Sequence, residues 1–187
     1  MNFTIKTNEL KALLIFAAKK DVRSYLNNIH FESTAEGVLA VSTNGHGLLA
    51  IKISNEPVEG LKHLVSRELC EQACKTKANF IEFELDNKQV TLSALNLSFS
   101  GLLSEGVFPD FRRVIPAIVS GIKEAEFDNS YLVDFDKVGA LLGTGKASLL
   151  QNGEAKAMVK FENYEAVGVL MPLRHTLPTS LTRPAWL

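Results

Sequence analysis

The chain carries the nonapeptide Phe108-Pro109-Asp110-Phe111-Arg112-Arg113-Val114-Ile115-Pro116, in which two prolines frame a hydrophobic and basic run. A second segment, Val169-Leu170-Met171-Pro172-Leu173-Arg174, has the pattern of a strand that ends in a proline and an arginine. Neither segment holds a general base or a nucleophile, so neither predicts catalysis. Together they indicate the walls of an apolar groove with a basic rim.

The bulk composition is that of a folded protein. The chain has 187 residues, of which 46% are hydrophobic and 22% charged, enough for one well-cored domain or a domain plus a fragment. No apolar run approaches the ~18 residues of a membrane span, and the first residues do not resemble a signal peptide. We therefore expect a cytoplasmic location and no membrane contact. The net charge of −1 argues against a protein that simply coats nucleic acid.

One pattern of elements recurs along the chain at a period of about 60 residues. Its order is strand, helix and three strands, with apolar residues at helical spacing in the first helix and turn residues between the strands. The first copy is expected at 3–6, 8–20, 25–32, 37–43 and 47–54. The second is expected at 61–65, 66–78, 80–85, 89–94 and 97–102. The third is expected at 124–127, 130–142, 147–151, 155–162 and 166–173.

These segments, with Asp21-Val22-Arg23-Ser24-Tyr25-Leu26-Asn27 and Thr43-Asn44-Gly45-His46, resemble the bacterial DNA polymerase III beta subunit, the sliding clamp. The resemblance covers about half of such a clamp. It implies an α+β fold in which each domain pairs two units, with helices on the inner face and antiparallel sheets outside. Residues 1–116 would form a complete domain, 117–174 a half-domain and 175–187 a C-terminal tail.

The resemblance also implies a groove for short peptides of the polymerase and the clamp loader. The residues carried over to it are Leu26, Thr43, Gly45, His46, Leu48, Pro109, Arg113, Val114, Val169, Leu170, Met171, Pro172, Leu173 and Arg174. Met171 can repack around different guests, and Arg113 and Arg174 would form a cationic rim. The family usually has a basic residue after the Gly-His pair, whereas this chain has Gly47. A charge at the mouth is therefore missing, and if the chain binds no clamp-binding peptide, we expect an arginine at that position to help.

Basic residues gather on or beside the three expected helices: Lys11, Lys19, Lys20, Arg23, Arg67, Lys75, Lys77, Lys137 and Lys146. Alone, such charges are usually a solvated face, and some would interact with helix C-termini. In a clamp-like arrangement they would face duplex DNA, weakly and without sequence preference.

Other signals predict no active site, metal or cofactor. Cys70 and Cys74 share a helix face and are interpreted as buried small hydrophobes. The segment 143–147 lacks the spacing and the hydroxyl of a phosphate-binding loop. The four histidines show no metal-ligand spacing. An enzyme is therefore not expected.

Two hypotheses remain. The first is a non-catalytic processivity factor that assembles around duplex DNA, and the alternative is a non-encircling adaptor or decoy that binds the same peptides. A clamp ring needs twelve units and this chain has three. We therefore expect a homo-oligomer, a dimer at minimum, with a tetrameric ring possible. The tail from 175 to 187 is either a frayed terminus or an insert that places Trp186 and Leu187 in an apolar groove.

Overall fold

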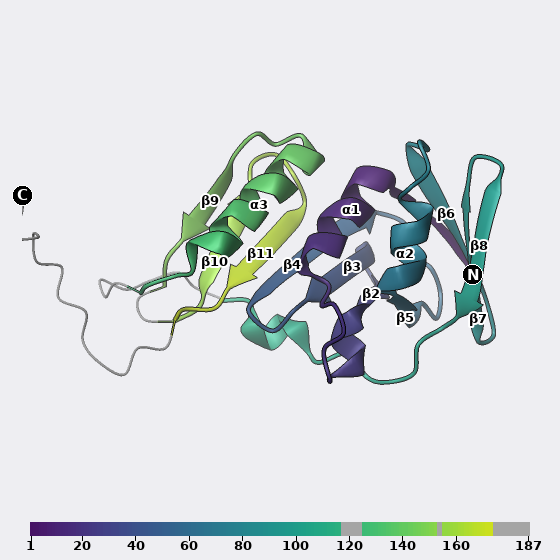
Figure 1. The fold of residues 1–187 in the computed structure, drawn as a ribbon, viewed down its shortest axis with the longest axis horizontal. Helices are drawn as coiled ribbons and strands as arrows, with labels where there is room; N and C mark the ends of the chain where they lie inside the picture. Colours follow the sequence, from purple (N-terminus) through teal and green to yellow (C-terminus); the bar gives the residue numbers. More distant parts are fainter. Residues whose placement is uncertain (117–124, 153–154, 174–187) are drawn as a thin grey trace, which may run out of the picture.

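The computed structural model describes residues 1–116, 125–152 and 155–173, and Figure 1 shows the path of the chain. Its helices are α1 (Thr7–Phe16), α2 (Arg67–Ala73) and α3 (Asn129–Leu142), with 3-10 turns η1 (Ser24–Asn27) and η2 (Phe111–Val114). Its strands are β1 (Asn2–Lys6), β2 (Asn28–Thr34), β3 (Gly37–Thr43), β4 (Gly47–Ser54), β5 (Lys62–Ser66), β6 (Phe80–Asp86), β7 (Gln89–Ala94), β8 (Leu97–Leu102), β9 (Ala147–Leu150), β10 (Ala157–Phe161) and β11 (Ala166–Leu170). No helix of the described ranges is long and apolar enough to cross a membrane.

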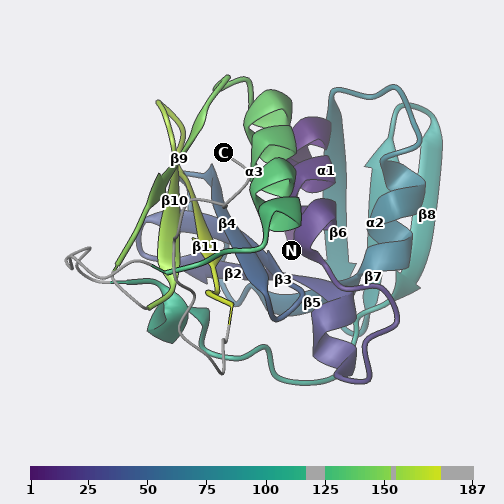
Figure 2. The ribbon, with the colours of Figure 1, turned by 60° about the vertical axis from the view of Figure 1, so that its left-hand side comes forward.

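The elements follow the predicted order of three units. Unit 1 is β1-α1-β2-β3-β4, unit 2 is β5-α2-β6-β7-β8, and the described part of unit 3 is α3-β9-β10-β11. Every strand pair in the two sheets is antiparallel. Helix α1 lies between α2 and α3 in both views, which brings the three helices together (Figures 1 and 2). The predicted α+β fold with antiparallel sheets is confirmed.

The predicted helices at 8–20 and 66–78 are too long. Helix α1 ends at Phe16, because Ala17 adopts an extended backbone with φ −67° and ψ 130°. Arg67 of unit 2 donates hydrogen bonds from its guanidinium to the carbonyls of Leu14 and Ala17. These carbonyls at the end of α1 are thus satisfied by a residue that lies far away in the sequence.

Three predicted strands also need correction. The strand expected at 166–173 ends at Leu170, shortly before Pro172, which cannot donate a ladder hydrogen bond. The strand expected at 25–32 begins only after η1, because a local turn precedes it. In that turn the Asn27 amide accepts a hydrogen bond from the Asp21 backbone N–H at 2.8 Å and donates one to the Asp21 carbonyl at 2.9 Å. The segment 125–127, which is the described part of the strand expected at 124–127, forms no strand.

Units 1 and 2 exchange strands. The four-stranded sheet has the order β1-β6-β7-β8, and the seven-stranded sheet has the order β5-β2-β3-β4-β11-β10-β9. Strand β1 of unit 1 therefore completes the sheet of unit 2, and β5 of unit 2 lies on the sheet of unit 1. Phe3 on β1 stacks on Phe83 at 4.8 Å and contacts Phe31 at 5.1 Å between ring centroids, which packs the space between the two sheets.

The cysteines lie in this core, as predicted. Both are free and buried, on or beside α2. Burial raises the pKa of Cys74 to about 11 and that of Cys70 well above its ordinary value. Both thiols are therefore protonated near neutral pH, and thiolate chemistry is not expected of them.

Unit 3 joins unit 1 where β4 and β11 pair, and we call this junction the seam. Gly168 pairs with Leu49 there, and Gly47 pairs with Leu170. Phe16 of α1 and Phe135 of α3 pack on each other at 4.5 Å between ring centroids, over these two glycines. An added Cβ at Gly47 would lie 2.5 Å from the Phe16 ring, and one at Gly168 would lie 2.3 Å from the Phe135 ring. The glycines thus make room for the aromatic pair that holds the helices together.

Candidate binding groove

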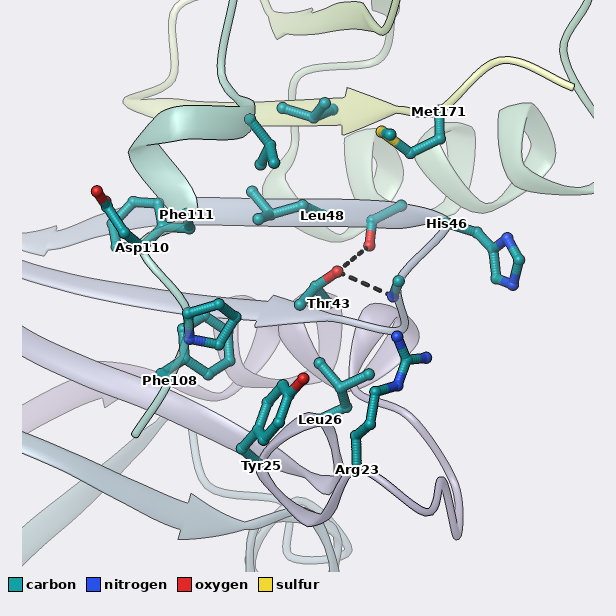
Figure 3. Close-up of a pocket in the computed structure, with 15 residues that line it drawn as sticks. Arg23, Tyr25, Leu26, Thr43, His46, Leu48, Phe108, Asp110, Phe111 and Met171 are labelled. Atoms are coloured by element: carbon teal, nitrogen blue, oxygen red, sulfur yellow. Dashed lines mark hydrogen bonds between the residues drawn. The ribbon is translucent and has the colours of Figure 1, made fainter. Parts of the chain in front are cut away.

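A cavity of about 180 Å³ opens at the seam, on the sheet face opposite to the helices (Figure 3). Its walls come from η1, the β3–β4 turn, the segment 108–114 and the end of β11. The residues that line it are Arg23, Tyr25, Leu26, Thr43, Gly45, His46, Gly47, Leu48, Phe108, Pro109, Asp110, Phe111, Val114, Val169 and Met171. We call this cavity the groove.

The floor of the groove is apolar and spans the seam. Leu48 of β4 and Val169 of β11 are register partners, and both are almost fully buried. Leu26 adds a third buried side chain from η1. Because side chains alternate along a strand, the neighbours Leu49 and Leu170 point to the other face and join the core under the helices. One side of each strand therefore serves the groove and the other holds the units together.

The β3–β4 turn forms the mouth of the groove and is tightly bonded. The Thr43 hydroxyl donates to the Gly47 carbonyl at 2.8 Å and accepts from the Gly45 N–H at 3.1 Å (Figure 3). Asn44 Oδ1 accepts from the N–H groups of His46 and Gly47 at 3.0 and 2.9 Å. Gly45 has φ +89°, a conformation that a residue with a side chain rarely adopts. The turn is thus a preformed edge.

Unit 3 holds this turn from the other side. The Met171 N–H donates to the His46 carbonyl at 3.0 Å. The His46 ring stacks on Tyr131 of α3 at 5.6 Å between centroids. The mouth is therefore built from both sides of the seam, and Met171 lies there with 41% of its surface exposed.

Arg23 and Asp21 form an ion pair at the rim. Arg23 Nε and one terminal nitrogen donate to the two carboxylate oxygens of Asp21 at 3.0 and 2.9 Å. The hydrogen bond from Arg23 lowers the pKa of Asp21 to about 2. The pair is exposed, so it contributes little to stability, but it leaves the rim close to neutral.

Curated proteins with similar sequences are beta sliding clamps. The chain is 26% identical over 142 residues to the clamp of Haemophilus influenzae, a match that covers 68% of this chain and 37% of that protein. It is 26% identical over 124 residues to the clamp of Escherichia coli K12, covering 62% of this chain and 34% of that protein. The matches thus span little more than a third of the relatives' length. No protein-family model matches the chain.

Solved structures show the same likeness. A crystal structure of the Pseudomonas aeruginosa DNA polymerase sliding clamp superposes with a TM-score of 0.76 at 20% identity, over 94% of this chain and 67% of that chain. The DNA polymerase III subunit beta of Borrelia burgdorferi gives a TM-score of 0.76 at 16% identity, over 93% of this chain and 64% of that chain. The fold is that of a bacterial sliding clamp. The chain resembles a shortened one.

Many of the residues that the clamp resemblance carried over to the groove do line this cavity. They are Leu26, Thr43, Gly45, His46, Leu48, Pro109, Val114, Val169 and Met171. Leu170 does not line the groove, because it points to the helix side and is fully buried in the core. Arg113, Pro172 and Leu173 lie outside the cavity, and Arg174 lies outside the described residues.

Sequence reasoning missed several lining residues. Phe108, Asp110 and Phe111 belong to the nonapeptide that indicated a groove. The order of its residues does not show which of its side chains point into the groove. Tyr25 and Arg23 lie in the segment quoted for its clamp resemblance, and Arg23 was expected to face DNA. Their places depend on η1, which the sequence pattern did not predict.

The packing around position 47 argues against an arginine there. Gly47 leaves no room for a side chain, because a Cβ there would meet the buried Phe16 ring. The side chain of an arginine at this position would start on the helix side and clash with Phe16, so its charge would not lie at the mouth of the groove. In this sliding-clamp fold the small residue is therefore a packing requirement of the seam.

The predicted DNA-facing residues differ in how free they are. Lys19, Lys20, Lys75, Lys77 and Lys146 are exposed, and Lys11 is half-buried. The Arg67 guanidinium binds the α1 carbonyls described above and pairs with Glu71 at 2.7 Å. Lys137 pairs with Asp134 at 2.8 Å. Arg67 and Lys137 thus offer less free charge than the exposed lysines.

Proposed function

We propose that this chain is a polymerase processivity factor of the sliding-clamp type, and that its groove binds short peptide motifs of replication proteins. The observation that carries the proposal is the apolar floor across the seam, formed by Leu48 and Val169 beside a preformed turn. The proposed function is the binding of a peptide, so it requires no catalytic residues. The names of the similar proteins support the same function.

The groove suits an extended peptide with one large aliphatic or aromatic anchor. Its volume of about 180 Å³ is that of one or two large side chains. Met171 is flexible and exposed at the mouth, so it can adapt to anchors of different shape. The near-neutral rim at Arg23 favours hydrophobic contact over strong charge recognition.

Titration with a fluorescent peptide that carries a bacterial clamp-binding motif tests the proposal. The chain should bind it, and Met171→Ala should weaken binding by about 1 to 2 kcal/mol, as the loss of contacts in a desolvated pocket does. Leu102→Ala is the matched control, because Leu102 is an exposed apolar residue on β8. A wild-type chain that does not bind the peptide would overturn the proposal.

We further propose weak contact with duplex DNA through the exposed lysines of the helix side. Lys19 and Lys20 follow α1, and Lys75 and Lys77 follow α2. None of these side chains is expected to read base edges, so the contact would be electrostatic and independent of sequence. Sequence preference on short duplexes would contradict it.

The chain is proposed to assemble with copies of itself. The seam leaves β9 as the last strand of the seven-stranded sheet among the described residues. In unit 1 the corresponding outer place beside β2 is filled by β5, lent by unit 2. A second copy could fill that place for unit 3, which agrees with the proposed division into a domain at 1–116 and a half-domain at 117–174. The tail at 175–187 lies outside the described residues.

Sedimentation at micromolar concentration separates this proposal from the adaptor. A dimer or tetramer supports assembly around DNA, with four copies needed for twelve units. A monomer of 20.5 kDa would remove the ring and favour the adaptor that binds peptides without encircling DNA.

A further inference from the structure

The segment 108–114 forms one wall of the groove, yet its backbone is bonded mainly to itself. The Arg113 N–H donates to the Asp110 carbonyl at 3.3 Å, and the Ile115 N–H donates to the Arg112 carbonyl at 3.2 Å. Within the described residues no backbone hydrogen bond joins 108–115 to a strand. Side chains must therefore hold this wall on the sheet.

An ion pair holds the middle of the segment. The Arg112 guanidinium donates to Glu32 Oε1, from the groove wall to β2. Glu32 is only 8% exposed. A buried carboxylate is costly unless it is paired and hydrogen-bonded, so Glu32 holds its partner in place.

A stacked pair holds the start of the segment. The His30 ring lies parallel to Phe108, with 4.9 Å between centroids and 6° between planes, and Phe111 meets it edge-on at 6.5 Å. His30 is 4% exposed, and its Nε2 lies 3.1 Å from Glu32 Oε2. Among the described residues His30 Nδ1 is buried without a hydrogen-bond partner, which fits a neutral ring whose proton sits on Nε2 and is donated to Glu32.

The protonation states agree with this arrangement. Burial lowers the pKa of His30 below its ordinary value, against the pull of Glu32. Burial raises the pKa of Glu32, but hydrogen bonds from Arg112 and His30 outweigh it and leave that pKa below the ordinary value. Near neutral pH the set is thus a carboxylate that accepts from one guanidinium and one neutral imidazole.

We infer that His30, Glu32 and Arg112 form a latch that positions the segment 108–114 as the wall of the peptide groove. None of the three lines the groove, so they act through Phe108, Phe111 and Val114 and not by touching the peptide. The neighbouring Arg113 is not part of the latch, and its backbone carbonyl accepts a hydrogen bond from Lys156 Nζ at 2.9 Å. The expected effect on peptide binding rests on the proposed function. The contacts that hold 108–114 do not depend on it.

Arg112→Ala is the main test, because half of the Arg112 side chain is exposed and its loss should leave the fold intact. Two readouts are needed: hydrogen exchange at the Arg113 and Ile115 amides in the free protein, and affinity for the fluorescent peptide. We expect faster exchange that is largest in this segment, a lower unfolding midpoint because the buried Glu32 carboxylate loses its charged partner, and about three- to tenfold weaker peptide binding, as the loss of one charge-assisted contact implies.

Two further variants and one control make the result specific to the Arg112–Glu32 pair. Arg112→Lys should recover part of the affinity, and Glu32→Gln combined with Arg112→Ala should bind no worse than Arg112→Ala alone. Lys88→Ala, which removes one positive charge from the β6–β7 turn, should change neither readout.

The outcomes separate the inference from the proposed function. Unchanged exchange in Arg112→Ala would overturn the latch, and so would faster exchange with unaltered peptide affinity. If the wild-type chain binds no peptide, the proposed function fails. Faster exchange that is largest in the segment would then still support the latch as the anchor of 108–114.

Discussion

The sliding-clamp fold joins the same unit to its neighbours in two different ways. Units 1 and 2 exchange strands, so that neither sheet is complete without a strand from the other unit. The sheets of units 1 and 3 exchange no strand among the described residues and meet edge to edge, along β4 and β11. The exchange of strands makes units 1 and 2 a single structural domain. The junction between units 1 and 3 depends on this strand pairing and on a few side chains, and the groove opens at it.

Two side-chain contacts support the junction between units 1 and 3 beside the pairing of β4 with β11. The aromatic pair Phe16 and Phe135 fills the space above the seam glycines. The Tyr164 hydroxyl donates to Glu9, a buried residue that also accepts from the Lys6 N–H at 3.0 Å. Each can be altered without touching the exchanged strands, so the two modes of joining can be tested apart.

The largest effect is expected from Gly168→Ala. Its new methyl group would meet the buried Phe135 ring, which is confined by Phe16 and Phe161 and has little room to move. Overpacking of this kind should lower the free energy of unfolding by about 1 to 3 kcal/mol, measured by urea denaturation.

Gly101→Ala is the control for that prediction. Its Cβ would lie 3.4 Å from Leu69, an ordinary contact, and the position belongs to β8, away from the seam. A Gly168→Ala variant as stable as Gly101→Ala would show that the Phe16–Phe135 pair is loosely packed over the seam, contrary to our expectation.

A smaller effect is expected from Tyr164→Phe. The change removes one of the hydrogen bonds that Glu9 accepts and leaves a buried carboxylate less satisfied. We expect a loss of about 1 to 2 kcal/mol in the free energy of unfolding. Tyr131→Phe, which keeps the ring that stacks on His46, should cost less. Equal losses in both variants would count against a special role for Tyr164.

Acidification should weaken the latch, by a smaller amount again. The pKa of His30 is below its ordinary 6.5 in the folded protein, so the unfolded chain binds this proton first and stability falls as the pH drops below 6.5. The pKa of Glu32 is also lowered, from 4.5, so its contribution is present above 4.5 and lost as the pH falls through the lower folded value.

The groups that face His30 are Glu32, Lys62 and Arg112, and they set the size of this effect. His30→Leu should remove the part of the pH dependence that begins near 6.5 and leave the part due to Glu32. Denaturation midpoints across this range check it, and an unchanged profile in the variant would assign the titration to another group.

The smallest effect concerns DNA. Replacing both Lys19 and Lys20 with alanine should weaken binding to a short duplex, and the slope of log affinity against log salt should fall by roughly two. Fluorescence anisotropy at several salt concentrations measures the slope. A slope that does not change would place any DNA contact elsewhere.

The sequence predicted strands better than it predicted their surroundings. The bounds of β3, β4, β7 and β8 agree with the prediction, because alternation and turn residues are local signals. The end of α1 was missed because Arg67 of another unit binds its last carbonyls. That contact exists only after the chain has folded.

The groove was predictable in outline and not in detail. The nonapeptide indicated a wall, but local pattern could not show that Arg112 turns toward Glu32 or that Phe108 stacks on His30. Leu170 was assigned to the groove by the clamp resemblance, and the strand register puts it on the opposite face. The size limit at Gly47 depends on Phe16, a helix residue that no strand pattern reveals.

Hydrogen exchange with and without the clamp-binding peptide tests the central claim most directly. The claim is that the groove at the seam is the docking site. Added peptide should slow exchange in the β3–β4 turn, in 108–114 and at the Met171 amide, with no change in β6, β7 and β8. Protection confined to β6–β8, or to the free side of β9, would contradict the account.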